Sequence, residues 1–504
     1  MLHKEGIRRK PFVRSTVTLL IPAVLLLVVL LLADVYQAHV TLLSSVDTDG
    51  EALHEALVED NVVDAADTSG AAGENLAQGD QPQLDGANPQ ENAVEADEYV
   101  YEAPEPIPPK VKDEYPEEWM LEAKATMALI DSQPQRFRRK KAFDLTFDKL
   151  RHGFIVRFKD GNMYAVAKML PGTEGVLGNW NDTMRQNREP PIELRQTLRA
   201  LCHHGLIGDP KFNIDFVVSV PDEPVNTIDD GGVPAFGWVK TAYDTDLLIP
   251  YPYTFDSMYP LSIVQNRGSL NNLDDIDQYC YNESLAAVNN YWDAKIPKGI
   301  WRGSTTGVQR FTRDNWRDQA RPKLVKYCME HEDICDAAIS GIVQAEEDAA
   351  EEMRQELLVG ENYMMSSDEQ GRFKYAIMMD GNSAPSSRTV TTLGQTSAIL
   401  KQSSPFMEFY YHSLRPYVHY LPIPRDIGED LSKVIEWARD HDDEVKQMVV
   451  RASTFRCRWL HDEIVQQYVV DLFDMYAERF RGIRGSIKTE DMIPIHINCG
   501  FNEY

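Results

Sequence analysis

The chain has 504 residues and a formal net charge of −28, with 79 acidic against 51 basic side chains. This balance excludes a protein that binds nucleic acid through a basic surface. About 390 residues follow an acidic N-terminal segment, which is more than one hydrophobic core usually serves, so two domains are expected.

The first predicted element is an apolar run at residues 17–33, broken only by Thr18 and Pro22. Extended back to Ser15, it approaches the length of about twenty residues that a bilayer core requires. Basic residues precede the run and acidic residues follow it, so the positive-inside rule places the amino terminus in the cytosol. We predict a cytosolic tail at residues 1–14 and a transmembrane anchor at residues 15–34. A cleaved signal peptide is the alternative, and both interpretations place the remainder in the lumen of the secretory pathway or outside the cell.

The next segment is strongly acidic. Residues 47–109 contain seventeen Asp or Glu and no Lys or Arg, and several prolines end the segment. Such a composition buries too little apolar surface to fold. Residues 35–110 are therefore predicted to form a disordered acidic stalk.

Six cysteines suit an oxidising compartment, and their spacing does not resemble a zinc site, so disulfides or buried thiols are expected. Their pairing is left open, because six cysteines allow fifteen pairings. Asn181 and Asn282 begin acceptor sequons for N-linked glycans, which have meaning only if this part of the chain is lumenal.

Apolar runs at residues 216–220 and 375–379 end at turn residues and are typical of buried strands. The spacing of apolar residues predicts core-facing helices over residues 431–438 and 464–476. Residues 346–356 are rich in acids and indicate a solvated helix face. Strands that alternate with helices predict an α/β protein with mainly parallel sheets.

Ligands of open α/β sheets bind beyond the carboxyl ends of strands, so residues in such places are the candidates for chemistry. The first candidate is a predicted loop at residues 299–307, whose backbone can approach a phosphate while Arg302 pairs with its charge. The other candidate residues of this loop are Gly303, Ser304, Thr305, Thr306 and Gly307. An ordinary glycine-rich turn is an equally good interpretation of these residues alone.

The second candidate follows the run at residues 375–379 and consists of Asp380, Gly381, Ser386, Ser387 and Arg388. Hydroxyl residues at the start of a predicted helix offer free N–H groups at the positive end of the helix dipole, and Arg388 would strengthen such an anion site. Plain N-capping by one of the two serines is the alternative.

The third candidate is Asp222, in a turn directly after the run at residues 216–220. A carboxylate in this place can accept a proton from a hydroxyl nucleophile. A lone acidic turn is more often without a catalytic role.

Together these loops resemble the glycosyltransferase family 90 domain, a family that includes fungal capsule-associated proteins and animal protein O-glucosyltransferases. The resemblance covers roughly residues 212–455. It is carried by the motif WRGSTTG at residues 301–307, by SSR at residues 386–388, and by the segment from SPFMEFYY to HYLP at residues 404–422.

The resemblance implies a GT-B fold, in which two Rossmann-like domains face a cleft that holds a nucleotide-sugar, without a metal or other cofactor. We place an acceptor-side domain at residues 111–298, a nucleotide-sugar-binding domain at residues 299–450 and a helical extension at residues 451–504. The family positions imply that Asp222 is the catalytic base. They also imply that Arg302 and Arg388 contact the donor pyrophosphate, and that Glu408 and His419 lie near the nucleotide.

A metal-dependent alternative is the triplet Asp244-Thr245-Asp246, of a kind that holds a metal–nucleotide pair in another glycosyltransferase fold. The family pattern around Asp246 favours a structural role instead.

The resemblance and the predicted anchor imply a type II membrane glycosyltransferase of the Golgi or endoplasmic reticulum. Its reaction would transfer glucose or xylose from a UDP-sugar to a hydroxyl of a glycan or secreted protein, with inversion. Preorganised arginines and loop N–H groups would stabilise the charge that grows on the leaving diphosphate. A catalytically inactive glycan-binding or assembly protein of the same fold is the alternative.

Overall fold

The computed structural model describes residues 115–169, 179–207, 209, 212–220, 223–227, 229–252, 273–385, 387–425 and 427–497. The predicted tail, anchor and stalk lie outside the described residues, as do Asp222 and Ser386. Within the described ranges, no helix is long and apolar enough to cross a membrane. The chain divides into two units, Met1–Val100 and Tyr101–Tyr504, and every described residue belongs to the second.

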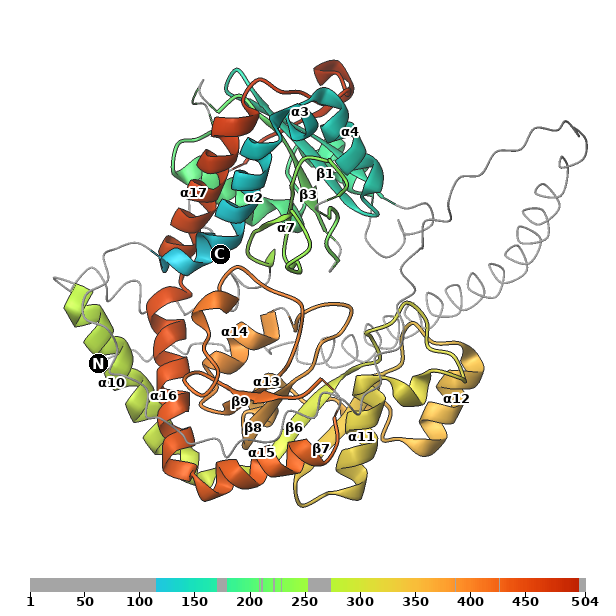
Figure 1. Cartoon of the computed structure of the whole chain (residues 1–504), viewed down its shortest axis with the longest axis vertical. Helices are drawn as coiled ribbons and strands as arrows, with labels where there is room; N and C mark the ends of the chain where they lie inside the picture. The colour runs from blue at the N-terminus through green and yellow to red at the C-terminus, as the bar shows by residue number, and fades with distance from the viewer. Residues whose placement is uncertain are drawn as a thin grey trace, which may run out of the picture. The chain divides into compact units, whose positions relative to one another are not determined.

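A six-stranded sheet in the order β11-β2-β1-β3-β4-β5 forms the centre of the first domain (Figure 1). Its strands are β1 (Gly153–Lys159), β2 (Asn162–Lys168), β3 (Asp215–Ser219), β4 (Ala235–Gly237), β5 (Leu247–Leu248) and β11 (Ile493–Ile495). The strands β3, β4 and β5 are parallel, but the pairings of β1 with β2, β1 with β3 and β11 with β2 are antiparallel. This sheet is therefore mixed rather than mainly parallel.

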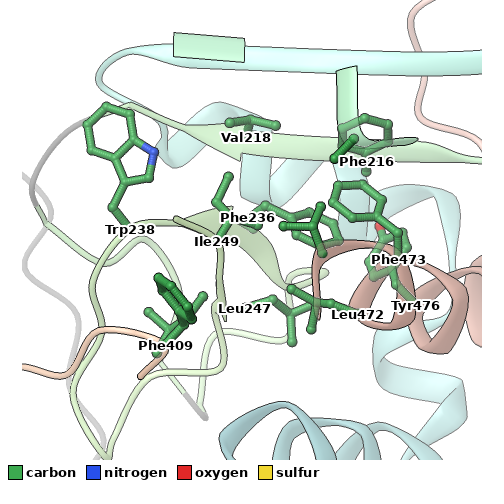
Figure 2. Packing of buried hydrophobic residues seen from close by; sticks show 14 of the residues in the cluster. Phe216, Val218, Phe236, Trp238, Leu247, Ile249, Phe409, Leu472, Phe473 and Tyr476 are labelled. Atoms are coloured by element: carbon green, nitrogen blue, oxygen red, sulfur yellow. The ribbon is translucent and has the colours of Figure 1, made fainter. Parts of the chain in front are cut away.

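Helices α2 (Leu121–Ser132), α3 (Pro134–Phe137), α4 (Lys140–Lys149), α6 (Trp180–Asn187), α7 (Ile192–His203) and α17 (Asp462–Phe480) belong to this domain, with a 3-10 turn at Glu117–Met120. The predicted helix over residues 464–476 is confirmed as α17, and its apolar repeat is buried. Figure 2 shows Phe473 and Tyr476 of α17 among the aromatic side chains of β3 and β4. The rings of Phe236 and Phe473 stack with centroids 4.1 Å apart. Residues of the predicted C-terminal extension thus complete the first hydrophobic core.

The second sheet has five strands, all parallel, in the order β10-β9-β8-β6-β7 (Figure 1). They are β6 (Ile296–Ser304), β7 (Cys335–Gly341), β8 (Phe373–Met378), β9 (Ala398–Gln402) and β10 (Leu421–Ile423). The chain leaves β6 toward β7 on one side and leaves β8 toward β9 on the other. The boundary between β6 and β8 is therefore a topological switch point, where open α/β sheets bind their ligands.

Both faces of this sheet are covered, by elements that include α10 (Leu273–Tyr291), α11 (Ala320–Glu330), α12 (Glu347–Glu356), α13 (Ser367–Gln370), α14 (Ser387–Leu393), α15 (Glu429–Asp440) and α16 (Asp442–Trp459). Short 3-10 turns lie at Trp292–Ala294, Trp316–Asp318, Glu361–Tyr363, Tyr411–Ser413 and Thr489–Asp491.

Side chains of β8 alternate between two clusters, because successive strand residues point to opposite faces. Tyr375 and Ile377 pack in the cluster that contains α15, and Ala376 and Met378 pack in the cluster that contains α14.

The apolar runs predicted as strands are confirmed as β3 and β8, and the helix predicted over residues 431–438 is confirmed as α15. The acid-rich segment forms α12, whose carboxylates pair with exposed arginines such as Arg313 and Arg317.

Disulfides join Cys280 to Cys457 and Cys328 to Cys335, and Cys202 is also disulfide-bonded. The expectation of disulfides is confirmed for these cysteines.

Candidate functional site

The loops that follow β6 and β8 meet at the switch point of the second sheet. The Gly307 N–H donates a hydrogen bond to Asn382 Oδ1 over 3.2 Å. Gly381 lies so close to the other loop that a Cβ placed on it would be 2.6 Å from Thr306 Oγ1. The structure therefore brings together the first two candidate segments of the sequence.

Much of the first candidate segment is strand rather than loop. Gly299 to Ser304 lie within β6, and only Thr305, Thr306 and Gly307 extend beyond it. A Cβ on Gly299 would be 2.9 Å from Ile377 Cδ1, and one on Gly303 would be 2.8 Å from the ring of Trp301. These two glycines permit close packing inside the sheet, so the prediction of a loop from residue 299 is wrong.

Thr305 connects this loop to the segment that follows β7. Its hydroxyl donates to Val343 O and accepts from the Val343 N–H, each over 2.7 Å, and its side chain is fully buried. The hydroxyl thus donates one hydrogen bond and accepts another within the protein. Thr305 therefore holds the loop in place.

Arg302 does not extend toward the end of β6. Its guanidinium pairs with Asp336 Oδ1 over 2.8 Å and donates to the carbonyl oxygens of Trp301 and Asp336. In the register of the strands, Asp336 lies opposite Ile300, two residues before Arg302. The side chain thus points back along the strand, 7% exposed and with its charge balanced by Asp336. This geometry does not favour the predicted contact of Arg302 with a diphosphate.

A different arginine lies between the two loops. Arg321, in the first turn of α11, donates to Ser304 O over 2.8 Å and to Asp380 O over 2.9 Å. Ser304 ends β6 and Asp380 follows β8, so one guanidinium joins the carboxyl ends of both strands. Burial and the neighbouring Arg388 lower the pKa of Arg321 to about 10, which leaves it charged at neutral pH. No motif in the sequence marks this residue.

Arg388 lies beside the end of β6. Its Nη1 donates to the carbonyl oxygen of Arg302, and burial lowers its pKa. Ser387 begins α14, which has seven residues and hence about two turns, so its dipole is short. A cavity of about 430 Å³ opens next to Arg388, between α14 and β8, and is lined by polar side chains such as Gln370 and Thr392 and by apolar ones such as Ile377.

Asp380 is the carboxylate among these cations. Burial raises its pKa, while a hydrogen bond from Ser404 and the charges of Lys401, Arg425 and Arg321 lower it. Lys401, on β9, lies over the ring of Tyr411 at 4.6 Å from its centroid, and burial lowers the pKa of its ammonium. Three cations thus lie around one carboxylate, and Arg388 lies beside one of them, Arg321, an arrangement that favours an anionic ligand.

Glu408 and His419 come from the segment after β9. Glu408 is buried, accepts a hydrogen bond from Tyr411 Oη over 2.8 Å and interacts with Lys401, which connects it to this cluster. His419 Nδ1 accepts a hydrogen bond from the Arg415 N–H over 3.0 Å, and its ring lies 5.5 Å from that of Phe455 on α16. Burial and two arginines lower the pKa of His419 to about 4, so it is neutral at pH 7. These contacts stabilise the turn between Arg415 and His419.

The predicted base, Asp222, lies outside the described residues, three positions after β3 ends at Ser219. The segment that follows it is held by Asp246, which is fully buried. Its carboxylate accepts hydrogen bonds from the N–H groups of Val225, Asn226 and Ala235 and from Asn226 Nδ2.

Those four hydrogen bonds bear on the two interpretations of the Asp244-Thr245-Asp246 triplet. Burial raises the pKa of Asp246 to about 6, so it is ionised at neutral pH and acts as an acceptor. Asp244 accepts from the N–H and the hydroxyl of Thr241, both over 2.7 Å. Asp246 uses both of its carboxylate oxygens in this way, which supports the predicted structural role of Asp246.

The two sequons differ in their surroundings. The Asn181 side chain forms hydrogen bonds with both the N–H and the carbonyl oxygen of Ala167, each over 2.9 Å, and so pairs with β2 as a short strand would. A glycan on Asn181 would remove the donor of this pair. Asn282 is exposed on α10, with its amide oxygen accepting from Gln278 Nε2.

Residues 210–492 match the sequence model described as "Glycosyl transferase family 90". Protein O-glucosyltransferase 2 of Danio rerio is 29% identical over 269 residues, which are 53% of this chain and 47% of that protein. Protein O-glucosyltransferase 3 of Mus musculus is 26% identical over 271 residues, 53% of this chain and 48% of that protein. The chain therefore spans about half the length of these curated relatives.

A solved structure of Anabaena HepE in complex with UDP-glucose is also similar, with 8% identity over 38% of this chain and 52% of that chain. Its TM-score of 0.27 is too low to support an inference about this protein. The sequence match, by contrast, confirms the resemblance predicted from the motifs.

Proposed function

Because the chain belongs to glycosyl transferase family 90, we propose that it is an inverting glycosyltransferase that moves a sugar from a UDP-sugar to a hydroxyl of a protein or glycan. The observation that carries the proposal is the cation cluster at the switch point, where Arg321, Lys401 and Arg425 lie around Asp380 and Arg388 lies beside Arg321. A nucleoside diphosphate is an anion that such a cluster suits, because arginine pairs well with phosphate oxygens.

In the proposed mechanism, Asp222 takes the proton of the acceptor hydroxyl. The acceptor oxygen attacks the anomeric carbon from the face opposite the diphosphate, and the bond between sugar and phosphate breaks. Negative charge then grows on the leaving diphosphate, where preorganised cations stabilise the transition state more than the ground state. A single contact of this kind contributes on the order of 3 kcal/mol, about a hundredfold in rate.

Several finer features belong to the same proposal. The donor sugar is glucose or xylose, the fold is GT-B-like, and the reaction uses no metal. The proposal that no metal is used is supported by Asp246, because both of its carboxylate oxygens already accept hydrogen bonds from N–H groups. The disulfides support an oxidising compartment, so we place the protein in the Golgi or endoplasmic reticulum with its described part in the lumen.

The test is a panel of UDP-sugars offered to the purified full-length protein, with UDP release and thermal unfolding as readouts. We expect release from UDP-glucose or UDP-xylose that survives EDTA, and a higher melting temperature in the presence of UDP. Protection by UDP without any release would favour the catalytically inactive alternative. The absence of UDP protection would reject the donor.

The role of Asp222 is tested by Asp222→Asn, with Glu223→Gln as the matched control. We expect Asp222→Asn to keep the protection by UDP and to lose most of the transfer. Glu223 is the neighbouring carboxylate and pairs with Arg151 at the surface, so its amide variant should transfer normally. Unchanged turnover of Asp222→Asn would remove Asp222 from the mechanism.

A further inference from the structure

The helix α10 packs against α16 and presents Asn282 on its other side (Figure 1). Its buried residues include Cys280, Ser284 and Val288, which are spaced by four and form one stripe. At 3.6 residues per turn, Asn282 lies about 160° around the helix from the middle of this stripe. Asn282 is exposed, and its amide oxygen accepts a hydrogen bond from Gln278 on the preceding turn. This hydrogen bond uses the oxygen and not the nitrogen, so a group attached to Nδ2 would extend into solvent.

The burial of Ser284, the third residue of this sequon, does not oppose the attachment of a glycan at Asn282. A sequon is recognised in the unfolded chain, before the helix forms. Cys457, which pairs with Cys280, is 177 residues further along and is synthesised after the sequon. The disulfide therefore cannot fix this part of α10 before the sequon is presented. In the folded chain the Ser284 hydroxyl has no hydrogen-bond partner among the described residues, so the fold does not require it.

Asn181, in the other sequon, is the opposite case. Its side chain accepts from the N–H of Ala167 and donates to the carbonyl oxygen of Ala167, each over 2.9 Å. Ala167 lies on β2 beyond residues 163–165, which pair with β11, so Asn181 continues the pairing where that strand has ended. An amide that pairs with one residue in both directions uses the N–H on the same side as its oxygen. A glycan takes the place of that hydrogen, so it would leave the buried carbonyl oxygen without its donor.

We propose that the chain carries an N-linked glycan at Asn282 and none at Asn181. This inference rests on the lumenal placement in the proposed function, because the glycan is added in the lumen. It goes beyond that function by assigning a modification site. The sequence alone does not separate the two sequons, whereas the structure does, since a bulky glycan suits an exposed side chain without partners on Nδ2.

The experiment produces the full-length protein in a eukaryotic secretory host and measures the mass of the folded fraction before and after peptide N-glycosidase. We expect wild type to lose the mass of one glycan. Ser284→Ala and Thr183→Ala each destroy one sequon but keep its asparagine, so they form a matched pair. Ser284→Ala should abolish the loss of mass. Thr183→Ala should leave it unchanged, and Thr183 is exposed, so its truncation should be tolerated.

A smaller loss of mass in Thr183→Ala than in wild type would show a glycan on Asn181 and would overturn the inference. If Ser284→Ala fails to fold, Asn282→Gln decides, and an unchanged loss of mass in it counts against the site. An unglycosylated wild type with the Cys280–Cys457 disulfide formed would also overturn the inference, because that protein has reached an oxidising compartment. An unglycosylated wild type with both of these cysteines as free thiols would instead reject the lumenal placement itself, and this inference with it.

Discussion

Asp215 and Asp246 are two buried carboxylates whose partners hold segments of the first domain together. Asp215 accepts from Arg157 Nη2 over 2.6 Å, from Arg484 Nη1 over 2.6 Å and from the Gly485 N–H over 3.1 Å. It thereby joins β1 and β3 to the chain that follows α17. Asp246 does the same for the segment after β3. Asp246 supplies acceptors to backbone N–H groups where the chain is irregular, because buried N–H groups must find acceptors.

Replacement of Asp246 by Asn should be strongly destabilising. An Asn side chain offers one acceptor oxygen and an NH₂ group, which would face backbone N–H groups that need an acceptor. We expect the free energy of unfolding to fall by about 2 to 4 kcal/mol, measured by urea denaturation.

Asp244→Asn is the matched control for this prediction. Only Oδ2 of Asp244 accepts from Thr241, so an amide oxygen can keep both hydrogen bonds. Equal losses of stability in the two variants would show that the hydrogen bonds of Asp246 do not carry the effect.

The sequence predicts site residues in loops directly after strands, such as Thr306 and Gly381, and the structure places these two residues side by side. Their position at the carboxyl end of a strand is a local signal that the chain itself displays. Arg321 has no such signal, because it lies in a helix and reaches the site only through the packing of α11 against the sheet. Arg302 shows the converse limit of the sequence, and its contact with a diphosphate stays a prediction. Its place in a glycine-rich motif does not reveal that Asp336 of the neighbouring strand holds its guanidinium.

At the scale of elements, glycines are central to two features that were not predicted from the sequence, the strand β6 and the hairpin of β1 and β2. Gly299 and Gly303 indicated a loop, but they lie in β6, where neighbouring side chains leave no room for a Cβ. Asp160 and Gly161 join β1 to β2 with φ angles of 51° and 77°, as a two-residue hairpin of this kind requires. This Asp-Gly pair was the signal in the sequence for the antiparallel part of the first sheet.

The disulfide between α10 and α16 should stabilise the protein more than the one between α11 and β7. Cys280 and Cys457 are 177 residues apart, whereas Cys328 and Cys335 are separated by 7, and a longer closed loop removes more entropy from the unfolded chain. Chain entropy alone gives about 5 kcal/mol for the first and about 2 kcal/mol for the second.

The measurement is the melting temperature of two double variants, Cys280→Ser with Cys457→Ser and Cys328→Ser with Cys335→Ser. Each variant serves as the control for the other, since both remove one buried disulfide. An equal or larger loss on removal of the short loop would contradict the entropic interpretation.

At the scale of the whole molecule, the first domain is built from both ends of the described chain. The family match covers residues 210–492, which leaves out β1, β2 and β11 of the first sheet. In the order of that sheet, β1 and β2 lie between β11 and β3. The matched region therefore lacks the strands that pair with one edge of β3, and it contains α17 without part of the core that this helix helps to cover.

A fragment of residues 210–492 should fail to form the first domain, whereas a fragment of residues 115–497 should fold. In the short fragment, Phe154, Ile155 and Val156 of β1 are missing, and each is at most 1% exposed in the complete domain. Their burial contributes about 2 kcal/mol each, so their loss together with that of β2 approaches the whole stability of a domain, about 5 to 15 kcal/mol. Near-ultraviolet circular dichroism and limited proteolysis of both fragments provide the measurement. A single cooperative unfolding transition for residues 210–492, equal to that of residues 115–497, would show that the first core does not depend on β1, β2 and β11.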